Sequence, residues 1–195
     1  MRHLVIGFGE VGKAIYDLLK ENPRWTVDAI DKENGFLSKK VYDFIHVAFP
    51  YSPTFEENVL SYYQKFSHEN GLIIIHSSVP VGTSKRIGSV SSPMRGTHPK
   101  LLESLKTFVK FFGGDRAEEA SRVFKEMGIK CFVHPSSNDC EAAKLWDTTQ
   151  YGWSIILNKI IYKWCLDNNC DFNFVYKLFN ETYNEAYSKL GESFY

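Results

Sequence analysis

Three glycines near the start of the chain have the spacing of a phosphate-binding turn. Gly7, Gly9 and Gly12 follow the apolar run Leu4-Val5-Ile6 as G-x-G-x-x-G, and an amphipathic stretch comes next. The first glycine permits a tight turn, the second lets main-chain N–H groups approach a diphosphate, and the third allows a helix to pack closely on a sheet. That helix would present free N–H groups and the positive end of its dipole to the phosphates. The pattern predicts a dinucleotide site.

An acid completes this unit. A second apolar run ends on Asp31, which lies 19 residues beyond Gly12. A carboxylate at this place accepts hydrogen bonds from the adenosine ribose hydroxyls and repels a 2′-phosphate, so we expect NAD rather than NADP. A glycine turn in some other α/β protein is the alternative. The cofactor residues predicted from this unit are Gly7, Phe8, Gly9, Glu10, Val11, Gly12, Asp31 and Lys32.

Short apolar runs alternate with amphipathic stretches through the first two-thirds of the chain. The predicted strands are His3–Ile6, Thr26–Ile30, Phe44–Ala48, Leu72–Ile75, Phe108–Phe112 and Lys130–Val133. Nearly continuous apolar runs of this length are typical of a parallel sheet covered on both faces. The predicted fold class is therefore α/β: a Rossmann-type, doubly wound, mostly parallel sheet over residues 1–135, followed by a short all-helical segment over 136–195.

Helix starts are marked by two capping-box patterns. These are Thr54-x-x-Glu57 before a helix over Asn58–Phe66, and Asp115-x-x-Glu118 before a helix that ends near Met127. Further along, we expect a long helix over Asp139–Asp167 and another from Asp171 or Asn173 to about Leu190.

The long predicted helix is apolar on most sides. Its large apolar residues are Trp146, Trp153, Ile155, Ile156, Leu157, Ile160, Ile161 and Trp164. Such a helix must be buried on most sides, and one further helix is too little to cover it. We therefore expect a homodimer through the C-terminal helices, with a mainly apolar interface. The alternative is that the last helix and the Rossmann domain cover it.

Composition excludes several function classes. Lys+Arg and Asp+Glu balance at 23 each, so no global field attracts nucleic acid or an acidic membrane. No apolar run approaches the roughly 18 residues of a membrane span, and no signal-peptide pattern opens the chain, so a cytoplasmic protein is expected. The four cysteines lack metal-ligand spacing, which predicts reduced thiols and no metal site.

Two further segments resemble UDP-glucose and GDP-mannose dehydrogenases of the 6-phosphogluconate (β-hydroxyacid) dehydrogenase superfamily. Val47-Ala-Phe-Pro-Tyr-Ser-Pro53 is similar to a strand-end loop of these enzymes, and His76-Ser-Ser-Val-Pro-Val-Gly-Thr83 to their Ser-Thr-Val-Pro-Val-Gly-Thr segment. The resemblance covers about residues 1–165 and implies a Rossmann domain, then a long helix leading into a dimer-forming helical domain. It also implies cofactor contacts from Ala48, Phe49, Pro50 and Ser77, and a place near the nicotinamide for Ser78, which would hold the substrate oxygen. Capping of a helix that starts near Thr83 is the alternative role for both serines.

The helix segment Glu141-Ala-Ala-Lys144-Leu-Trp-Asp-Thr148 resembles a family segment with lysine and, four residues on, asparagine. Residues at this spacing share one helix face. Near a cationic nicotinamide and away from water, Lys144 could take the hydroxyl proton as the hydride leaves. A solvated surface lysine is the alternative, and Thr148 replaces the asparagine of the substrate clamp.

One loop departs from the family pattern. Ser92-Pro93 is followed by Met94 where the family has glutamate, and the family's catalytic cysteine loop has no counterpart, so only a single hydride transfer is expected. The segment Met94–Lys100 mildly resembles the Thr-His-Pro loop of prephenate dehydrogenases. Arg95 and Lys100 suit recognition of a carboxylate or phosphate, and His98 suits general-base catalysis. Solvated basic residues are the alternative.

These patterns predict an NAD-dependent oxidoreductase that acts on a CH–OH group of a small anionic substrate, sugar-like or a hydroxyacid. The expected catalytic residues are Lys144, Ser78 and His98; the expected substrate-binding residues are Arg95, Lys100 and Thr148. Two alternatives stay open: a catalytically degenerate NAD-binding module with a regulatory or scaffolding role, and a decarboxylating dehydrogenase of the prephenate type. Five further histidines have no partner that the sequence indicates and are expected to be structural or surface residues: His3, His46, His68, His76 and His134.

Overall fold

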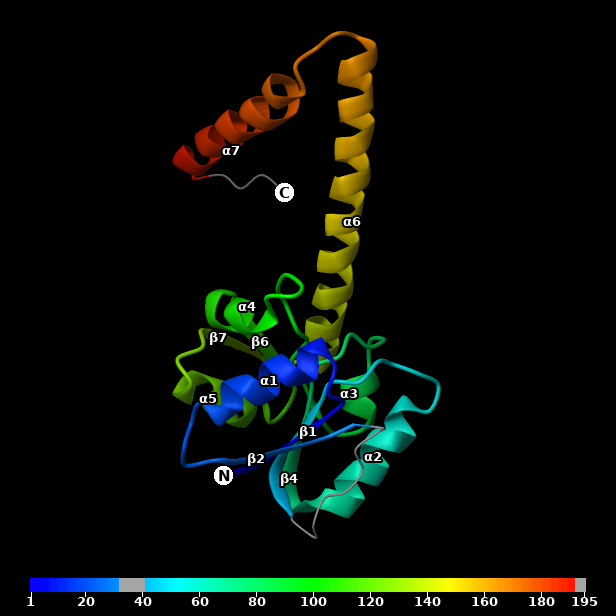
Figure 1. Ribbon diagram of the computed structural model, residues 1–195, viewed down its shortest axis with the longest axis vertical. Helices are drawn as coiled ribbons and strands as arrows, with labels where there is room; N and C mark the ends of the chain where they lie inside the picture. The colour runs from blue at the N-terminus through cyan, green and yellow to red at the C-terminus, as the bar shows by residue number, and fades with distance from the viewer. Residues whose placement is uncertain (32–40, 192–195) are drawn as a thin grey trace. The chain divides into compact units, whose positions relative to one another are not determined.

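Apolar strands with few charges form a sheet that is covered on both faces. The computed structural model describes residues 1–31 and 41–191. Within these, one seven-stranded sheet has the order β2-β1-β3-β4-β5-β6-β7 (Figure 1). The strands are β1 (Arg2–Ile6), β2 (Thr26–Ile30), β3 (Tyr42–Val47), β4 (Ser67–Ile75), β5 (Val90–Ser91), β6 (Lys110–Gly113) and β7 (Cys131–His134). Neighbouring strands are parallel except at the β5–β6 pair. The predicted α/β, doubly wound, mostly parallel sheet is confirmed.

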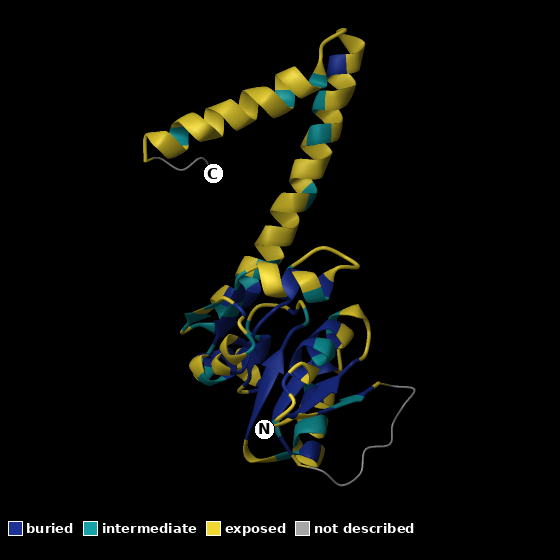
Figure 2. Ribbon diagram, turned by 60° about the vertical axis from the view of Figure 1, so that its left-hand side comes forward, coloured by how far each residue is buried: buried dark blue, intermediate teal, exposed yellow. Residues whose placement is uncertain are grey.

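Helices cover this sheet in two apolar layers because successive strand residues face opposite sides. The helices of this part are α1 (Glu10–Lys20), α2 (Phe55–Phe66), α3 (Thr83–Arg86), α4 (Leu101–Thr107) and α5 (Ala117–Glu126). Val5 and Ile74 pack with α1, α4 and α5, whereas Leu4 and Ile45 pack with α2. Figure 2 shows the strands as the buried centre between these helices. Strand order turns about β1, which places a crevice at the carboxyl ends of β1 and β3.

Several predicted boundaries were wrong. The strand expected over Phe108–Phe112 begins at Lys110, because α4 runs into Phe108, whose N–H donates to the Ser104 carbonyl at 2.8 Å. Neither α4 nor the two-residue β5 was predicted. The capping boxes do not form either: α2 begins at Phe55 with no side-chain cap, and the Thr54 hydroxyl accepts a bond from the Asn58 amide at 3.1 Å. Helix α5 begins at Ala117 after Arg116, again with no side-chain cap.

The other histidines have partners that the sequence does not indicate. His3, His46 and His76 are buried structural residues, hydrogen-bonded to one another across the sheet. His68 pairs with the Asp43 carboxylate at 3.1 Å, and His134 lies 3.6 Å from the carboxylate of Asp139. Strand register sets these contacts, and the sequence contains no local sign of it.

The chain divides into two compact units, Met1–Leu145 and Trp146–Tyr195. The predicted domain boundary at residue 135 stays a prediction. Helix α6 (Ser137–Asp167) begins in the first unit, and the second also holds the π-helical segment η1 (Asn173–Leu178) and α7 (Phe179–Lys189). The Asp171 carboxylate accepts the Asn173 N–H at 2.9 Å and so starts the second predicted helix. No helix of the described residues is long and apolar enough to cross a membrane.

Candidate functional site

The glycine turn between β1 and α1 brings backbone close to backbone. Gly7 has φ +90°, and a Cβ at this position would lie 2.8 Å from the Phe49 nitrogen. A Cβ at Gly12 would lie only 1.8 Å from the Gly7 carbonyl oxygen. Helix α1 can therefore pack this closely on β1 only because Gly12 has no side chain. The turn leaves the first N–H groups of α1 with no side-chain cap among the described residues.

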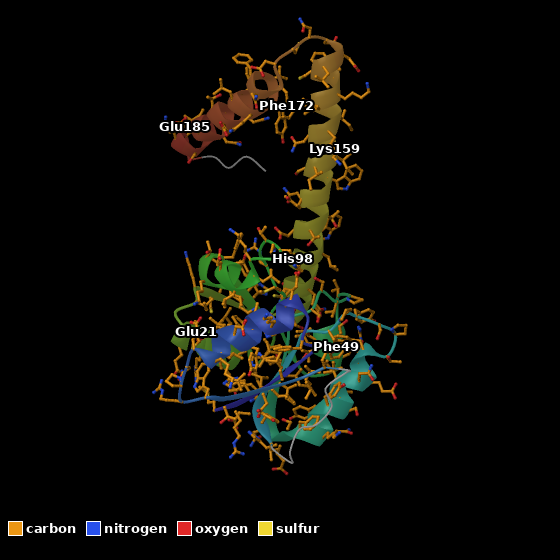
Figure 3. All side chains as sticks on the ribbon, in the orientation of Figure 1. Glu21, Phe49, His98, Lys159, Phe172 and Glu185 are labelled. Atoms are coloured by element: carbon orange, nitrogen blue, oxygen red, sulfur yellow. The ribbon has the colours of Figure 1, made fainter. Side chains whose placement is uncertain are left out.

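A cleft of about 630 Å³ opens beside this turn at the carboxyl ends of β1 and β3. Its volume is in the usual range for small-molecule sites. The lining residues are Ile6, Gly7, Phe8, Gly9, Glu10, Val11, Asp31, Ala48, Phe49, Pro50, Asn58, Tyr62 and His98. Figure 3 labels two of them, Phe49 and His98. Most residues predicted to bind a cofactor thus lie around one cavity, together with His98.

Asp31 is held at the edge of the glycine turn. It follows β2 directly, and its carboxylate accepts the Phe8 N–H at 3.1 Å. The acid is exposed and lines the cleft, which is the arrangement needed to accept bonds from sugar hydroxyls. The other predicted residue of this part, Lys32, lies outside the described residues.

The loop after β3 forms a second wall. Phe49 packs against the Phe55 ring at 4.9 Å and the Tyr62 ring at 6.3 Å, both from α2. The Ser77 hydroxyl donates to the Phe49 carbonyl at 2.6 Å, so Ser77 fastens this loop. Asn58 and Tyr62 also line the cleft but were not predicted. Their spacing of four on the helix that follows the loop was the available signal.

The cleft mouth carries an acid and an imidazole from distant parts of the chain. Glu10 is the first residue of α1, where the helix dipole favours a negative charge. The His98 Nδ1 atom contacts the Glu10 carboxylate, so in neutral His98 the Nδ1–H donates and Nε2 keeps its lone pair. Both side chains are exposed. This pair has the chemistry of an oriented general base.

A buried acid joins the Ser78 loop to helix α6. Glu141 is 2% exposed, and its carboxylate accepts the N–H groups of Gly82 at 2.6 Å and Ser84 at 2.8 Å. Lys144 stands three residues further along the same helix. Glu141 therefore fixes the loop that carries Ser78 relative to the helix turn that carries Lys144.

No protein-family model and no curated protein matches the sequence. Solved structures do match. A UDP-D-ManNAc dehydrogenase from Pyrococcus horikoshii aligns with a TM-score of 0.79 at 14% identity over 93% of this chain and 58% of its own. A UDP-N-acetyl-mannosamine dehydrogenase from Staphylococcus aureus gives 0.73 at 17% identity over 93% and 58%. A 3-hydroxyisobutyrate dehydrogenase from Mycobacterium tuberculosis gives 0.69 at 16% over 87% and 66%. The chain has the fold of these dehydrogenases. It spans 58% of the length of the first two.

Not every predicted residue of this dehydrogenase fold lines the cleft. Among the described residues, His98 does so, whereas Ser78, Lys144, Arg95, Lys100, Ser77 and Gly12 do not. Ser78 is exposed in the loop after β4, and Lys144 is half-buried. The Arg95 guanidinium lies over the Phe111 ring at 5.4 Å. Thr148 belongs to the second unit. The roles of these residues stay predictions.

Proposed function

We propose that the chain binds NAD and transfers a hydride between the nicotinamide and a CH–OH group of a small anionic substrate, sugar-like or a hydroxyacid. One observation carries the proposal: the uncapped N-terminus of α1, the glycine turn and Asp31 all border one cleft of about 630 Å³. Free N–H groups at a helix start bind phosphate, and the acid suits the ribose hydroxyls. The dehydrogenase fold supports the same reading.

The choice of NAD over NADP rests on Asp31. The Phe8 N–H holds its carboxylate at the glycine turn, so a 2′-phosphate at the ribose would meet a negative charge. Calorimetry with both dinucleotides tests this. We expect the unchanged protein to bind NAD more tightly than NADP. In Asp31→Asn the ratio of the two affinities should decrease, because the charge that repels the 2′-phosphate is gone. Tighter binding of NADP by the unchanged protein would reject the role of Asp31.

For the chemical step, bound NAD supplies the hydride acceptor, and the chain supplies the proton acceptor and the anion site. We assign the base to His98, because it lines the cleft and the Glu10 carboxylate orients its ring. Lys144 is the second candidate base, and Ser78 would hold the substrate oxygen. Arg95 and Lys100, in the same loop as His98, would bind the substrate anion.

A screen of anionic hydroxyacids and sugar nucleotides for NADH formation tests this assignment. We expect turnover that His98→Ala lowers by at least about a hundredfold, the usual contribution of a general base, with NAD affinity nearly unchanged. Loss of turnover in Lys144→Ala but not in His98→Ala would move the base to Lys144.

A second candidate function is NAD binding without turnover, in a regulatory or scaffolding role. The placement of Ser78 and Lys144 outside the cleft lining favours it. NAD binding with no turnover on any substrate of the screen would support this candidate. Release of CO₂ together with NADH would instead support the decarboxylating dehydrogenase that the Thr97-His98-Pro99 loop suggests.

We also propose a homodimer through the second unit. Its helices expose large apolar side chains, among them Trp146 at 72% and Trp153 at 67%. Exposed apolar surface of this extent is typical of an interaction site. Light scattering after gel filtration should give the mass of two chains, and Trp153→Glu with Ile160→Glu should give one. A monomeric unchanged protein would contradict the proposal.

A further inference from the structure

Three buried imidazoles form a single row through the sheet interior that the proposed function does not use. His3 Nδ1 lies 3.1 Å from His46 Nε2, and His46 Nδ1 lies 3.0 Å from His76 Nε2. The row ends where His76 Nδ1 meets the Ser92 carbonyl oxygen at 3.0 Å. The three residues are at most 1% exposed. We call His3, His46 and His76 the imidazole chain.

The Ser92 carbonyl fixes every proton in the imidazole chain. A carbonyl oxygen only accepts, so His76 carries its proton on Nδ1 and accepts with Nε2. His46 must then donate from Nδ1, and His3 must do the same. All three rings are neutral in this arrangement, and His3 Nε2 is left with a lone pair. That atom is buried and has no hydrogen-bond partner among the described residues.

Lys110 links the imidazole chain to a further strand, β6. It is 4% exposed, and its Nζ donates to the same Ser92 carbonyl at 3.0 Å. The side chains thus connect β1, β3 and β4 with β6 through Ser92, which directly follows β5. The main-chain ladder is short here: β5 pairs with β4 at Ile74↔Val90 and Ile75↔Ser91, and with β6 at Ser91↔Gly113. The network therefore reinforces the junction between β4 and the segment formed by β5, β6 and β7.

The surroundings of the imidazole chain disfavour charge. Phe124 of α5 presents its ring to His46 and His76, at centroid distances of 6.1 and 5.8 Å, and lies 5.2 Å from Lys110 Nζ. Of the charged groups, the N-terminal amine and Asp43 face His3, and Lys110 faces His46 and His76. The thiols of Cys140 and Cys131 face Lys110.

Burial sets the protonation of this network. Together with the N-terminal amine, a smaller cause, it lowers the pKa of His3 to about 4, although Asp43 acts in the opposite direction. Burial also lowers the pKa values of His46 and His76 well below their usual range, with Lys110 as an added cause. Burial lowers the pKa of Lys110 to about 7. No carboxylate of the described residues raises the pKa of His46 or His76.

We propose that the imidazole chain and Lys110 hold the segment formed by β5, β6 and β7 on β4 when the rings are neutral, and that acid opens this junction between β4 and β5 before the rest of the sheet unfolds. Among the three rings, a proton can enter only at His3 Nε2, and its uptake reverses each hydrogen bond that it passes. The charge then lies in an apolar layer beside Lys110. Opening of the junction exposes the rings to water, where they accept protons freely, so acid favours the open state.

Amide hydrogen exchange measures this opening residue by residue. The N–H groups of Ser92 and Met94, which donate to Ile75 and His76 at 2.8 and 2.9 Å, report the junction; the Ala48 N–H, which donates to Ile6 at 2.8 Å, reports the parallel strands. When an opening exposes one histidine, the equilibrium constant for that opening increases about tenfold between pH 7.5 and 5.5, because the exposed ring binds a proton. After correction for intrinsic rates, protection at Ser92 and Met94 should fall at least about tenfold more than at Ala48. An equal fall at all three amides, or none, would overturn the proposal.

A matched pair of variants separates the imidazole chain from other histidines. His46→Gln keeps a donor and an acceptor but does not titrate, whereas His68→Gln removes an exposed histidine. We expect the pH-dependent loss of protection to shrink about tenfold in His46→Gln and to persist in His68→Gln. Equal behaviour of the two variants would refute the proposal. If His46→Gln does not fold, ¹⁵N NMR of the unchanged protein decides: three buried rings protonated on Nδ1 alone at pH 7.5 support it, and any one protonated on Nε2 overturns it.

Discussion

Replacement of Gly12 by alanine tests the closeness of α1 to β1. The new Cβ would lie 1.8 Å from the Gly7 carbonyl oxygen and 2.9 Å from its carbon, whereas ordinary contacts begin near 3.4 Å. Both atoms belong to the backbone, so no side-chain rotation relieves the clash, and α1 must move by more than an ångström. Overpacking of a core lowers the free energy of unfolding by about 1–3 kcal/mol. A clash between two main-chain segments should cost at least the upper value, because neither segment can rotate away. We expect a loss of about 3 kcal/mol or more.

Urea unfolding followed by circular dichroism measures this loss in the free energy of unfolding. Gly9→Ala is the matched control, because a Cβ at Gly9 meets no described atom within 4 Å and its φ of −72° suits alanine. It should cost at most about 1 kcal/mol, as a change at a helix N-cap does. Its methyl group would instead occupy the space of the diphosphate, so NAD binding should weaken strongly. Equal stability of Gly12→Ala and the unchanged protein would show that α1 does not pack this closely on β1.

Two further predictions concern stability. Glu141→Ala leaves the part-buried Gly82 N–H and the buried Ser84 N–H without their acceptor, at about 1–3 kcal/mol each. Urea unfolding should therefore show a loss of about 2–6 kcal/mol, and a change below about 0.5 kcal/mol would contradict the anchoring role. The pKa of His3 is about 4 in the folded state and 6.5 when unfolded, so the unfolded state binds more protons between these values. His3 alone should therefore remove about 3 kcal/mol as the pH falls from 6.5 to 4, and a flat stability profile over that window would contradict this.

Local patterns predicted the first part of the fold well. The β1–α1–β2 unit follows from the glycine spacing and two apolar runs, and the acid at its end lies where the pattern placed it. The two-residue β5 is too short to show a period. The seven-residue helix α4 is followed directly by apolar residues around Phe108, and that apolar run predicts a strand rather than a helix. The Thr54 hydroxyl was expected to cap α2 but bonds the Asn58 side chain instead.

The site was predictable only where it is local in sequence. The glycine turn and Asp31 belong to one motif, so the sequence alone predicts that they lie together, and both line the cleft. His98 and Glu10 are 88 residues apart, and His3 and His46 are 43 apart, so only the tertiary arrangement brings each pair together. Spacing along the chain carries no information about such contacts, which strand register and loop packing decide.

Calorimetry of the purified chain with NAD is the decisive measurement of cofactor binding. We expect saturable binding of one NAD per chain, weaker binding of NADP, and a large loss of NAD affinity in Gly9→Ala, whose fold should persist. Absence of binding by any adenine dinucleotide to the folded protein would contradict the proposed NAD site, and so would undiminished NAD affinity in Gly9→Ala.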